Sequence, residues 1–241
     1  PFVDGDPVNF IDWKVTARTG RFHVKEFEAL KTMPIYLIVD TSASMGFSSQ
    51  RLSKYQMALL ISGGLGLAGL RRLSPVGIIG GGERQLHYVP SLSRNRVFRW
   101  LHDLRRTNFS ERTCIAERLD DAVGLVRERC LFLIVSDLHD PEIVPSVKRG
   151  AQRNDCVVLH LEDPAERGRL RGGIFRGREA ESDNSFAAHG RSQWFAGEEE
   201  QQRTNLQAGG IDYLNLKTDQ PFVAPLRHFL VHRGGLLRNA R

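Results

Sequence analysis

Residues 35–46 read IYLIVDTSASMG. The first five residues of this stretch are apolar or aromatic without a break, which is the pattern of a strand buried on both faces of a parallel sheet. An acidic residue and several hydroxyl residues follow and lead toward a helix. In an open α/β sheet, ligands lie beyond the carboxyl ends of the strands. The loop that begins at Asp40 is therefore the first place to look for a site.

Three further apolar runs have the same character, and segments with helical spacing lie between them. The runs are Val76–Ile79, Leu131–Val135 and Val157–Leu161, and the helical segments are Lys54–Leu73, Arg96–Leu104, Ile115–Arg129 and Ile143–Arg153. Alternation of this kind predicts an α/β fold with a doubly wound, mainly parallel sheet and helices on both faces.

The sheet is expected to have one antiparallel edge strand. Residues Arg84–Val89 follow three glycines and alternate in polarity, which is the pattern of a hairpin partner. We predict a last strand at Ile211–Leu216 and a closing amphipathic helix at Phe222–His232. The polar stretch at about residues 164–210 is long for a loop. It is predicted to be an insertion that either holds small elements of its own or is partly mobile.

The composition is that of an ordinary globular domain, since 41% of the 241 residues are hydrophobic and 26% are charged. No run approaches the about 18 apolar residues that cross a bilayer, so we expect no transmembrane segment in this chain. The three cysteines show neither paired nor CxxC spacing, which argues against disulfides and a cysteine zinc site and favours the cytoplasm. Because the chain begins at Pro1 without a methionine, we expect that the native N-terminus is missing.

The loop after the first strand offers oxygen ligands for a hard divalent cation. Asp40 supplies a carboxylate, and Ser42 and Ser44 supply hydroxyls at alternate positions. Mg²⁺ takes oxygen ligands in an octahedron and retains several waters, so it is the expected cofactor, with Mn²⁺ and Ca²⁺ as alternatives. The other reading of these residues is that they cap the following helix.

The remaining ligands should come from neighbouring strand ends. Asp137 comes at the end of the third apolar run and is preferred to Asp140, which leads into a turn or a helix start. Thr113 stands just before a helix and offers a third hydroxyl, with Thr107 as the alternative. The predicted metal ligands are therefore Asp40, Ser42, Ser44, Thr113 and Asp137.

This ligand set resembles the metal-ion-dependent adhesion site of von Willebrand factor A domains. In that family the serines and the threonine contact the metal, the aspartates act largely through bound water, and a partner's carboxylate commonly fills the open position. The motifs at residues 4–6, 11–14, 16–20 and 24–28 are also similar to the signature of a bacterial family catalogued as domain of unknown function 58. The resemblance implies an N-terminal signature segment, residues 1–31, that packs on a von Willebrand factor A-like domain, residues 32–241.

Members of that bacterial family are typically encoded beside MoxR-type AAA+ ATPases and are thought to help them act on or assemble other proteins. The resemblance therefore implies a cytoplasmic, non-enzymatic, metal-dependent protein-interaction module. It would be an accessory partner of such an ATPase in protein assembly or remodelling. An acidic residue of the ATPase would complete the metal shell.

Two other functions agree with parts of the sequence. Haloacid-dehalogenase-type phosphatases carry a second aspartate where Ser42 stands, and a serine cannot deliver a proton as a carboxylic acid can, which argues against a phosphatase-like metal-dependent hydrolase. No nucleophile motif accompanies His139, and Gly80–Gly82 lacks the lysine and hydroxyl of a phosphate loop. The net charge of +6 and the pI near 9.6 permit nucleic-acid binding, but the arginines are scattered.

Overall fold

The computed structural model describes residues 12–23, 32–107, 109, 111–166, 174–178, 185–189 and 196–233. The chain divides into two compact units, Pro1–Lys31 and Thr32–Arg241. Most of the N-terminal signature, including residues 4–6 and 24–28, lies outside the described residues. That the first unit packs on the second therefore stays a prediction.

The described part of the first unit is a short capped helix, α1, at Trp13–Thr19. Its start is stabilised by Asp12, whose side chain accepts hydrogen bonds from the backbone N–H groups of Lys14 and Val15. The helix ends at Gly20, which has a φ of 68° and so takes the left-handed conformation that glycine tolerates best.

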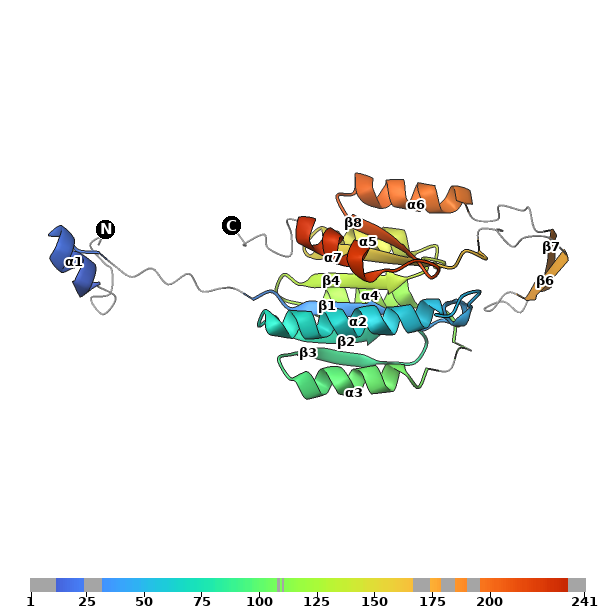
Figure 1. The fold of residues 1–241 in the computed structure, drawn as a ribbon, viewed down its shortest axis with the longest axis horizontal. Helices are drawn as coiled ribbons and strands as arrows, with labels where there is room; N and C mark the ends of the chain where they lie inside the picture. The colour runs from blue at the N-terminus through green and yellow to red at the C-terminus, as the bar shows by residue number, and fades with distance from the viewer. Residues whose placement is uncertain are drawn as a thin grey trace. The chain divides into compact units, whose positions relative to one another are not determined.

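Six of the described strands form one sheet in the order β3-β2-β1-β4-β5-β8 (Figure 1). All neighbouring pairs are parallel except β2 and β3. The predicted fold class and the antiparallel edge strand are therefore confirmed. The strands are β1 (Ile35–Val39), β2 (Val76–Gly80), β3 (His87–Ser91), β4 (Leu131–Ser136), β5 (Asp155–Glu162) and β8 (Asp212–Lys217).

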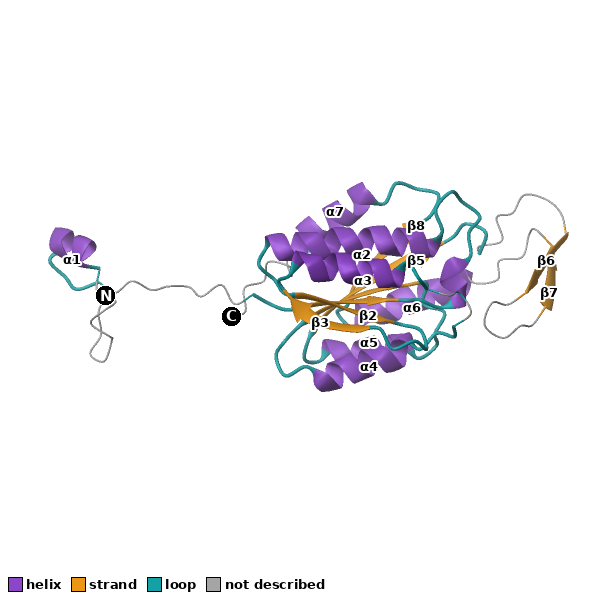
Figure 2. Cartoon of the chain, turned by 90° about the horizontal axis from the view of Figure 1, so that it is seen from below, coloured by secondary structure: helices purple, strands orange, loops and turns teal. Residues whose placement is uncertain are grey.

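Helices cover both faces of this sheet (Figure 2). Leu37, Leu133 and Leu159 belong to the apolar core on one face, and the alternate residues Ile38 and Ile134 belong to the core on the other. The first core is closed by α2 (Lys54–Arg71), α3 (Arg94–Leu104) and α7 (Val223–His232), and the second by α4 (Ile115–Leu125), α5 (Ile143–Ala151) and α6 (Ala196–Ala208). The continuous apolar runs of the sequence follow from burial on both sides.

Residues within the predicted insertion form elements of their own. Strands β6 (Ile174–Arg178) and β7 (Ser185–His189) pair antiparallel, and α6 follows them. Leu206 of α6 is fully buried in the second core, so the C-terminal part of the insertion contributes to the domain itself.

The edge strand begins later than the polarity pattern predicts, at His87 instead of Arg84. The backbone between β2 and β3 first has to turn, and the N–H of Gly80 donates to the carbonyl of Leu86 as the turn closes. The pairing is irregular between Val76 and Ile78. There the backbone of β3 comes so close to Gly77 that a Cβ atom on this glycine would lie 2.5 Å from the carbonyl oxygen of Tyr88. Glycine is therefore required at this bulge.

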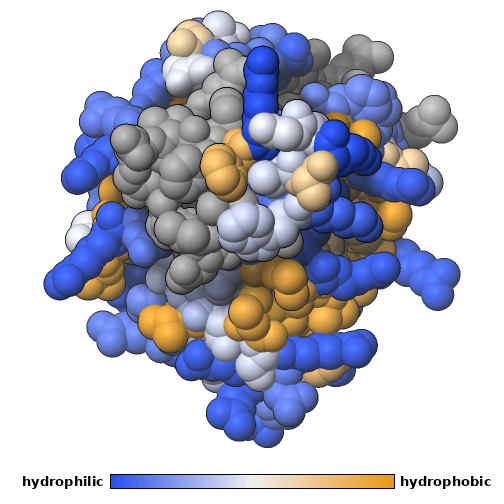
Figure 3. Space-filling model, turned by 90° about the vertical axis from the view of Figure 1, so that its left-hand side faces the viewer, coloured by the Kyte–Doolittle hydropathy of each residue, from blue (hydrophilic) through white to orange (hydrophobic). Residues whose placement is uncertain are grey.

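The predicted helix Ile115–Arg129 ends at Leu125, because Val126 takes an extended conformation. Without this extended residue, the charged residues after Val126 would continue the helix beyond the part that is buried. None of the described helices combines the length and the hydropathy needed to cross a bilayer. On the visible surface, apolar side chains are interspersed with hydrophilic ones (Figure 3), as is usual for globular proteins.

Candidate metal centre

The loop after β1 brings three oxygen-bearing side chains into one tight turn. The carboxylate of Asp40 is buried, and its Oδ1 atom accepts a hydrogen bond from the backbone N–H of Ser42 at 3.0 Å. The hydroxyl oxygens of Ser42 and Ser44 lie 3.0 Å apart. A short 3-10 helix, Ala43–Gly46, then turns the chain away, with Ser42 as its N-terminal flanking residue. Ser42 makes no side-chain cap hydrogen bond there, so capping does not account for its hydroxyl.

The end of the neighbouring strand β4 delivers the second acid. Asp137 follows β4 directly and is 3% exposed. The next residue, Leu138, has a φ of 58°, a left-handed conformation that costs a branched residue about 1–2 kcal/mol. The backbone N–H of Leu138 donates to the hydroxyl of Ser136 at 2.9 Å, and its side chain is buried in the core. These contacts hold the sharp turn that places Asp137 beside Asp40.

Backbone hydrogen bonds bring the segment with Thr113 to the same loop. The N–H of Ala43 donates to the carbonyl of Glu111 at 3.0 Å, and the N–H of Cys114 donates to the carbonyl of Gly81 at 2.7 Å. Thr113 itself forms an isolated antiparallel bridge with Gly82. Its hydroxyl oxygen is buried and has no hydrogen-bond partner among the described residues. Backbone hydrogen bonds thus hold the chain on both sides of Thr113, whereas its hydroxyl has no hydrogen-bond partner among the described residues.

The two alternative ligands have other contacts. The hydroxyl of Thr107 donates to the carbonyl of Leu104 at 2.8 Å and bonds to the hydroxyl of Tyr55 at 2.7 Å. The carboxylate of Asp140 accepts hydrogen bonds from the backbone N–H groups of Ala116 and Glu142. Both side chains therefore have structural roles that explain their presence.

The two buried acids have opposite electrostatic environments. Burial raises the pKa of Asp40 to about 6, the negative charge of Asp137 adds to this effect, and hydrogen bonds from Ser136 and Ser42 oppose it. Burial would also raise the pKa of Asp137, but the positive charge of Lys54 outweighs burial, with help from His139 and the Ser44 hydroxyl, so this pKa is lowered. Asp137 is therefore the permanently ionised member of the pair.

Sequence reasoning missed Lys54, which places a positive charge next to Asp137. Its ammonium nitrogen lies 2.6 Å from Oδ2 of Asp137 and also contacts Glu166, and its side chain is completely buried. Nδ1 of His139 lies 3.4 Å from the same oxygen of Asp137. The lysine is the first residue of α2 and lies 83 residues from Asp137 in the sequence. A lone lysine at a helix start carries no local signal of such a contact.

Two buried oxygen atoms at the site have no hydrogen-bond partner among the described residues, Oγ1 of Thr113 and Oδ1 of Asp137. An unpaired buried oxygen costs free energy, so such atoms are rare unless a water or an ion satisfies them. Together with the Ser42 and Ser44 hydroxyls they form an oxygen-only donor set, which suits Mg²⁺, Mn²⁺ or Ca²⁺. The residues present therefore fit a hard divalent cation.

Asp137, His139 and Glu166 also present ligand atoms that lie within 4.8 Å of one another, a spacing at which they could hold a metal ion. The Lys54 ammonium, however, contacts both carboxylates of this group. The chain itself thus already provides a positive charge for these two carboxylates.

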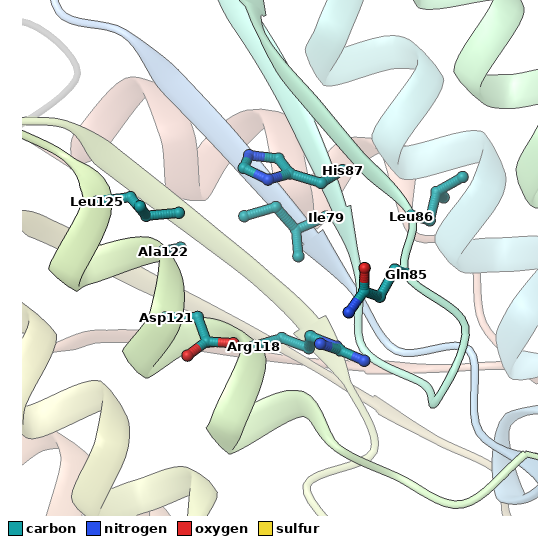
Figure 4. A pocket seen from close by; sticks show the side chains of 8 residues that line it. All are labelled: Ile79, Gln85, Leu86, His87, Arg118, Asp121, Ala122 and Leu125. Carbon is teal, nitrogen blue, oxygen red and sulfur yellow. The ribbon is translucent and has the colours of Figure 1, made fainter.

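A half-open groove of about 190 Å³ lies elsewhere, between the β2–β3 hairpin and α4 (Figure 4). Its walls carry Ile79, His87, Arg118 and Asp121 among others, and none of the predicted metal ligands lines it. The predicted metal ligands therefore lie outside this groove.

Solved structures of two bacterial proteins have the same fold as this chain. Conserved hypothetical protein BatB from Bacteroides thetaiotaomicron is 15% identical, with a TM-score of 0.55 over 82% of this chain and 96% of that chain. An aerotolerance-related membrane protein from Bacteroides fragilis is 14% identical, with a TM-score of 0.57 over 83% and 97%. With the strand order described above, the chain is an α/β protein of the von Willebrand factor A-like class.

The chain belongs to the family described as protein of unknown function DUF58, whose model matches residues 1–203. Uncharacterized protein Rv1480 of Mycobacterium tuberculosis and uncharacterized protein Mb1516 of Mycobacterium bovis are each 23% identical to it over 170 residues. The matched region is 68% of this chain and 54% of each relative. The chain thus spans about half the length of the curated relatives it matches.

Proposed function

We propose that this chain is a metal-dependent protein-interaction module and that Asp40, Ser42, Ser44, Thr113 and Asp137 hold its cation, with Mg²⁺ as the preferred ion. The observation that supports the proposal is the pair of buried oxygens of Thr113 and Asp137 without a hydrogen-bond partner among the described residues. They belong to segments whose backbone is hydrogen-bonded to β1, to the loop after it or to Gly81.

Each residue has a separate task in this site. The hydroxyls of Ser42, Ser44 and Thr113 are suited to direct coordination because they are neutral and close to the turn. Asp40 and Asp137 supply the negative charge and would act largely through water. The bound cation supplies a Lewis acid that can accept one more oxygen ligand, from a carboxylate of a partner protein. Loss of water from that carboxylate would be offset by a short ionic bond.

We further propose that the partner is a MoxR-type AAA+ ATPase in the cytoplasm, and that the module helps it assemble or remodel other proteins. The family resemblance supports this part of the proposal. The net charge of +6 also favours an acidic partner surface, because opposite charges raise the rate of association.

The proposed module does not catalyse a reaction. In the proposed site the hydroxyls serve the cation, and Lys54 neutralises Asp137, whose Oδ2 atom lies 3.4 Å from Nδ1 of His139. The hydroxyl of Ser136, which donates to Asp40, is fully buried at the end of β4 and also accepts the N–H of Leu138, so it serves the fold. The alternative is a phosphatase-like hydrolase, and steady turnover of a phosphomonoester that disappears in Ser42→Ala would favour it.

Titration calorimetry with Mg²⁺ and Mn²⁺ tests the metal site directly. The unaltered chain should bind one ion, and Asp40→Asn should weaken binding at least tenfold because the site loses a full negative charge. Asp219→Asn is the matched control, since Asp219 is exposed and lies outside the site. Equal binding by the unaltered chain and Asp40→Asn would exclude the proposed site.

A further inference from the structure

Lys54 is in an unfavourable position for a lysine unless it serves the site. Its side chain is fully buried, and burial of an ammonium group is costly without a partner. It is also the first residue of α2, where the helix dipole disfavours a positive charge, and no acidic residue lies in the first turn to compensate. The compensation comes instead from Asp137 and Glu166.

The two carboxylate oxygens of Asp137 have different contacts. The Oδ2 atom accepts a hydrogen bond from the Lys54 ammonium at 2.6 Å. The Oδ1 atom is buried and has no hydrogen-bond partner among the described residues. A cation that binds through Oδ1 would therefore share one carboxylate with a fixed positive charge. Because the group is buried, solvent screens this repulsion only weakly.

We propose that Lys54 is an internal counter-cation that competes with the divalent ion for Asp137 and so keeps the affinity of the metal site low. This inference rests on the proposed function, because it assumes that the ion binds at Asp40, Ser42, Ser44, Thr113 and Asp137. Glu166 acts in the opposite direction from Lys54, since it accepts from the same ammonium and draws part of that charge away from Asp137. The lysine and the glutamate together set how much of Asp137 remains for the ion.

The same contacts explain why a second metal ion is not needed among Asp137, His139 and Glu166. The ammonium of Lys54 contacts both carboxylates of this group, and His139 lies on the same Oδ2 atom. An additional ion there would have to displace the lysine from a fully buried position. The cluster is therefore the counter-ion site of Lys54.

Calorimetry of the full chain with MgCl₂ tests the inference through two opposite variants. Lys54→Met keeps an unbranched side chain, one atom shorter, and removes its charge, so the Kd for Mg²⁺ should fall at least about tenfold. Glu166→Gln leaves the ammonium more fully on Asp137, so the Kd should rise several-fold. Lys148→Met is the matched control, because Lys148 is exposed on α5, and its Kd should equal that of the unaltered chain.

Thermal unfolding supplies a second measurement that does not depend on calorimetry. In EDTA, Lys54→Met should unfold at a lower temperature than the unaltered chain, because the buried Asp137 and the half-buried Glu166 lose their cation. Added Mg²⁺ should then raise its Tm by more than it raises the Tm of the unaltered chain. A purely structural ion pair would lower the Tm in EDTA but leave the Kd unchanged.

The outcomes separate this inference from the proposed function. If the unaltered chain binds Mg²⁺ and Lys54→Met binds it equally or more weakly, Lys54 is only a structural partner of Asp137 and the inference is wrong. If Lys54→Met does not fold, Glu166→Gln decides, and binding as tight as in the unaltered chain overturns the inference. If neither the unaltered chain nor the variants bind Mg²⁺ or Mn²⁺, the proposed metal site itself fails.

Discussion

The hydroxyl of Ser136 donates a hydrogen bond to Oδ2 of Asp40, with 2.6 Å between the two oxygens. The same hydroxyl accepts the backbone N–H of Leu138 at 2.9 Å. Ser136 thus joins the end of β1 to the end of β4 and supports the turn that carries Asp137. All of these groups are buried, so the hydrogen bonds are not weakened by competition with water.

Ser136→Ala should therefore destabilise the metal-free chain. A buried hydrogen bond to a carboxylate contributes about 1.5–3 kcal/mol, and its removal leaves Oδ2 of Asp40 unsatisfied. Urea denaturation in EDTA measures the change in the free energy of unfolding. Ser93→Ala is the control, because Ser93 is exposed and its side chain makes no cap hydrogen bond. A loss no larger than that of the control would mean that Ser136 does not hold Asp40.

The buried Asp40 should also make the stability of the metal-free chain depend on pH. Its folded-state pKa is about 6 and its ordinary value is 3.8. Between these values the folded chain holds a proton that the unfolded chain has released, so this contribution is present at low pH and is lost as pH rises toward 6. The loss should be of the order of 2 kcal/mol.

Denaturation in EDTA at pH 4 to 7 measures this effect, and Asp40→Asn should not show it. Asp137 contributes in the opposite sense, because its lowered pKa adds stability that is lost only as pH falls below its ordinary value of 3.8. The two acids therefore act in different pH windows. An identical pH dependence in the unaltered chain and in Asp40→Asn would show that Asp40 is not the group concerned.

The C-terminal helix is attached to the sheet by a buried arginine. Arg233 follows α7, its side chain is 3% exposed, and it bonds to Asp155 at the start of β5 and to Asp212 at the start of β8. Loss of a partner from a buried ion pair leaves uncompensated charge. Arg233→Met should lower the free energy of unfolding by about 2–4 kcal/mol, somewhat less than for a fully buried pair because Asp212 is half exposed.

Arg227→Met is the matched control for this change, because Arg227 lies exposed on the same helix. Mg²⁺ binding should be equal in both variants, since the strands begin at the edge of the sheet opposite to the proposed metal site. Chemical denaturation and calorimetry on the same samples check both parts. If Arg233→Met unfolds like its control, the helix is held by its apolar contacts alone.

Most of the fold could be predicted because its signal is local. Each central strand is buried on both faces, so residues such as Leu37 and Ile38 are apolar in succession, and the shortness of these runs favours strands over buried helices. The ends of elements were predicted less well. The start of β3 depends on how closely Tyr88 approaches Gly77, and that approach is a property of the bulge in three dimensions.

The residues of the candidate site could likewise be predicted where they are close in sequence, and could not where they meet from distant segments. Asp40, Ser42 and Ser44 lie in one turn, so their spacing alone shows that their oxygens are close together. Lys54 and Glu166 meet across 112 residues, and neither belongs to a recognisable pattern. The left-handed conformation of Leu138 is equally hidden, because it is held by surrounding contacts and not by the preference of leucine.

Association with the proposed ATPase partner should depend on both the ion and salt. If the partner's carboxylate completes the metal shell, EDTA should abolish association of the purified proteins, and Mg²⁺ or Mn²⁺ should restore it. Because the chain carries a net charge of +6, rising salt should slow association more than it speeds dissociation. Surface plasmon resonance measures both rates.

Asp137→Ala should weaken that association while the circular dichroism spectrum stays unchanged. Asp219→Ala, an exposed acid outside the site, is its control. Association that is indifferent to EDTA and to Asp137→Ala would place the interface elsewhere on the chain, and the N-terminal segment would be the next region to test.

The two threonines considered as ligands should respond in opposite ways to replacement by valine, which has the same shape. The hydroxyl of Thr107 bonds to Leu104 and Tyr55, so Thr107→Val should lower the free energy of unfolding by about 1–2 kcal/mol and leave Mg²⁺ binding unchanged. The buried hydroxyl of Thr113 has no partner among the described residues. Thr113→Val should therefore leave the metal-free stability equal or slightly raised, because it removes an unsatisfied polar atom.

The same Thr113→Val change should weaken Mg²⁺ binding at least about tenfold, because a direct ligand is replaced by a methyl group that cannot coordinate an ion. Urea denaturation in EDTA and calorimetry with MgCl₂ measure the two properties on each variant. We thus expect Thr107→Val to lower stability without affecting metal affinity, and Thr113→Val to lower metal affinity without lowering stability. If Thr113→Val instead lost stability and bound Mg²⁺ normally, the hydroxyl would serve the fold, and the ion would have to take its remaining ligand from another residue or from water.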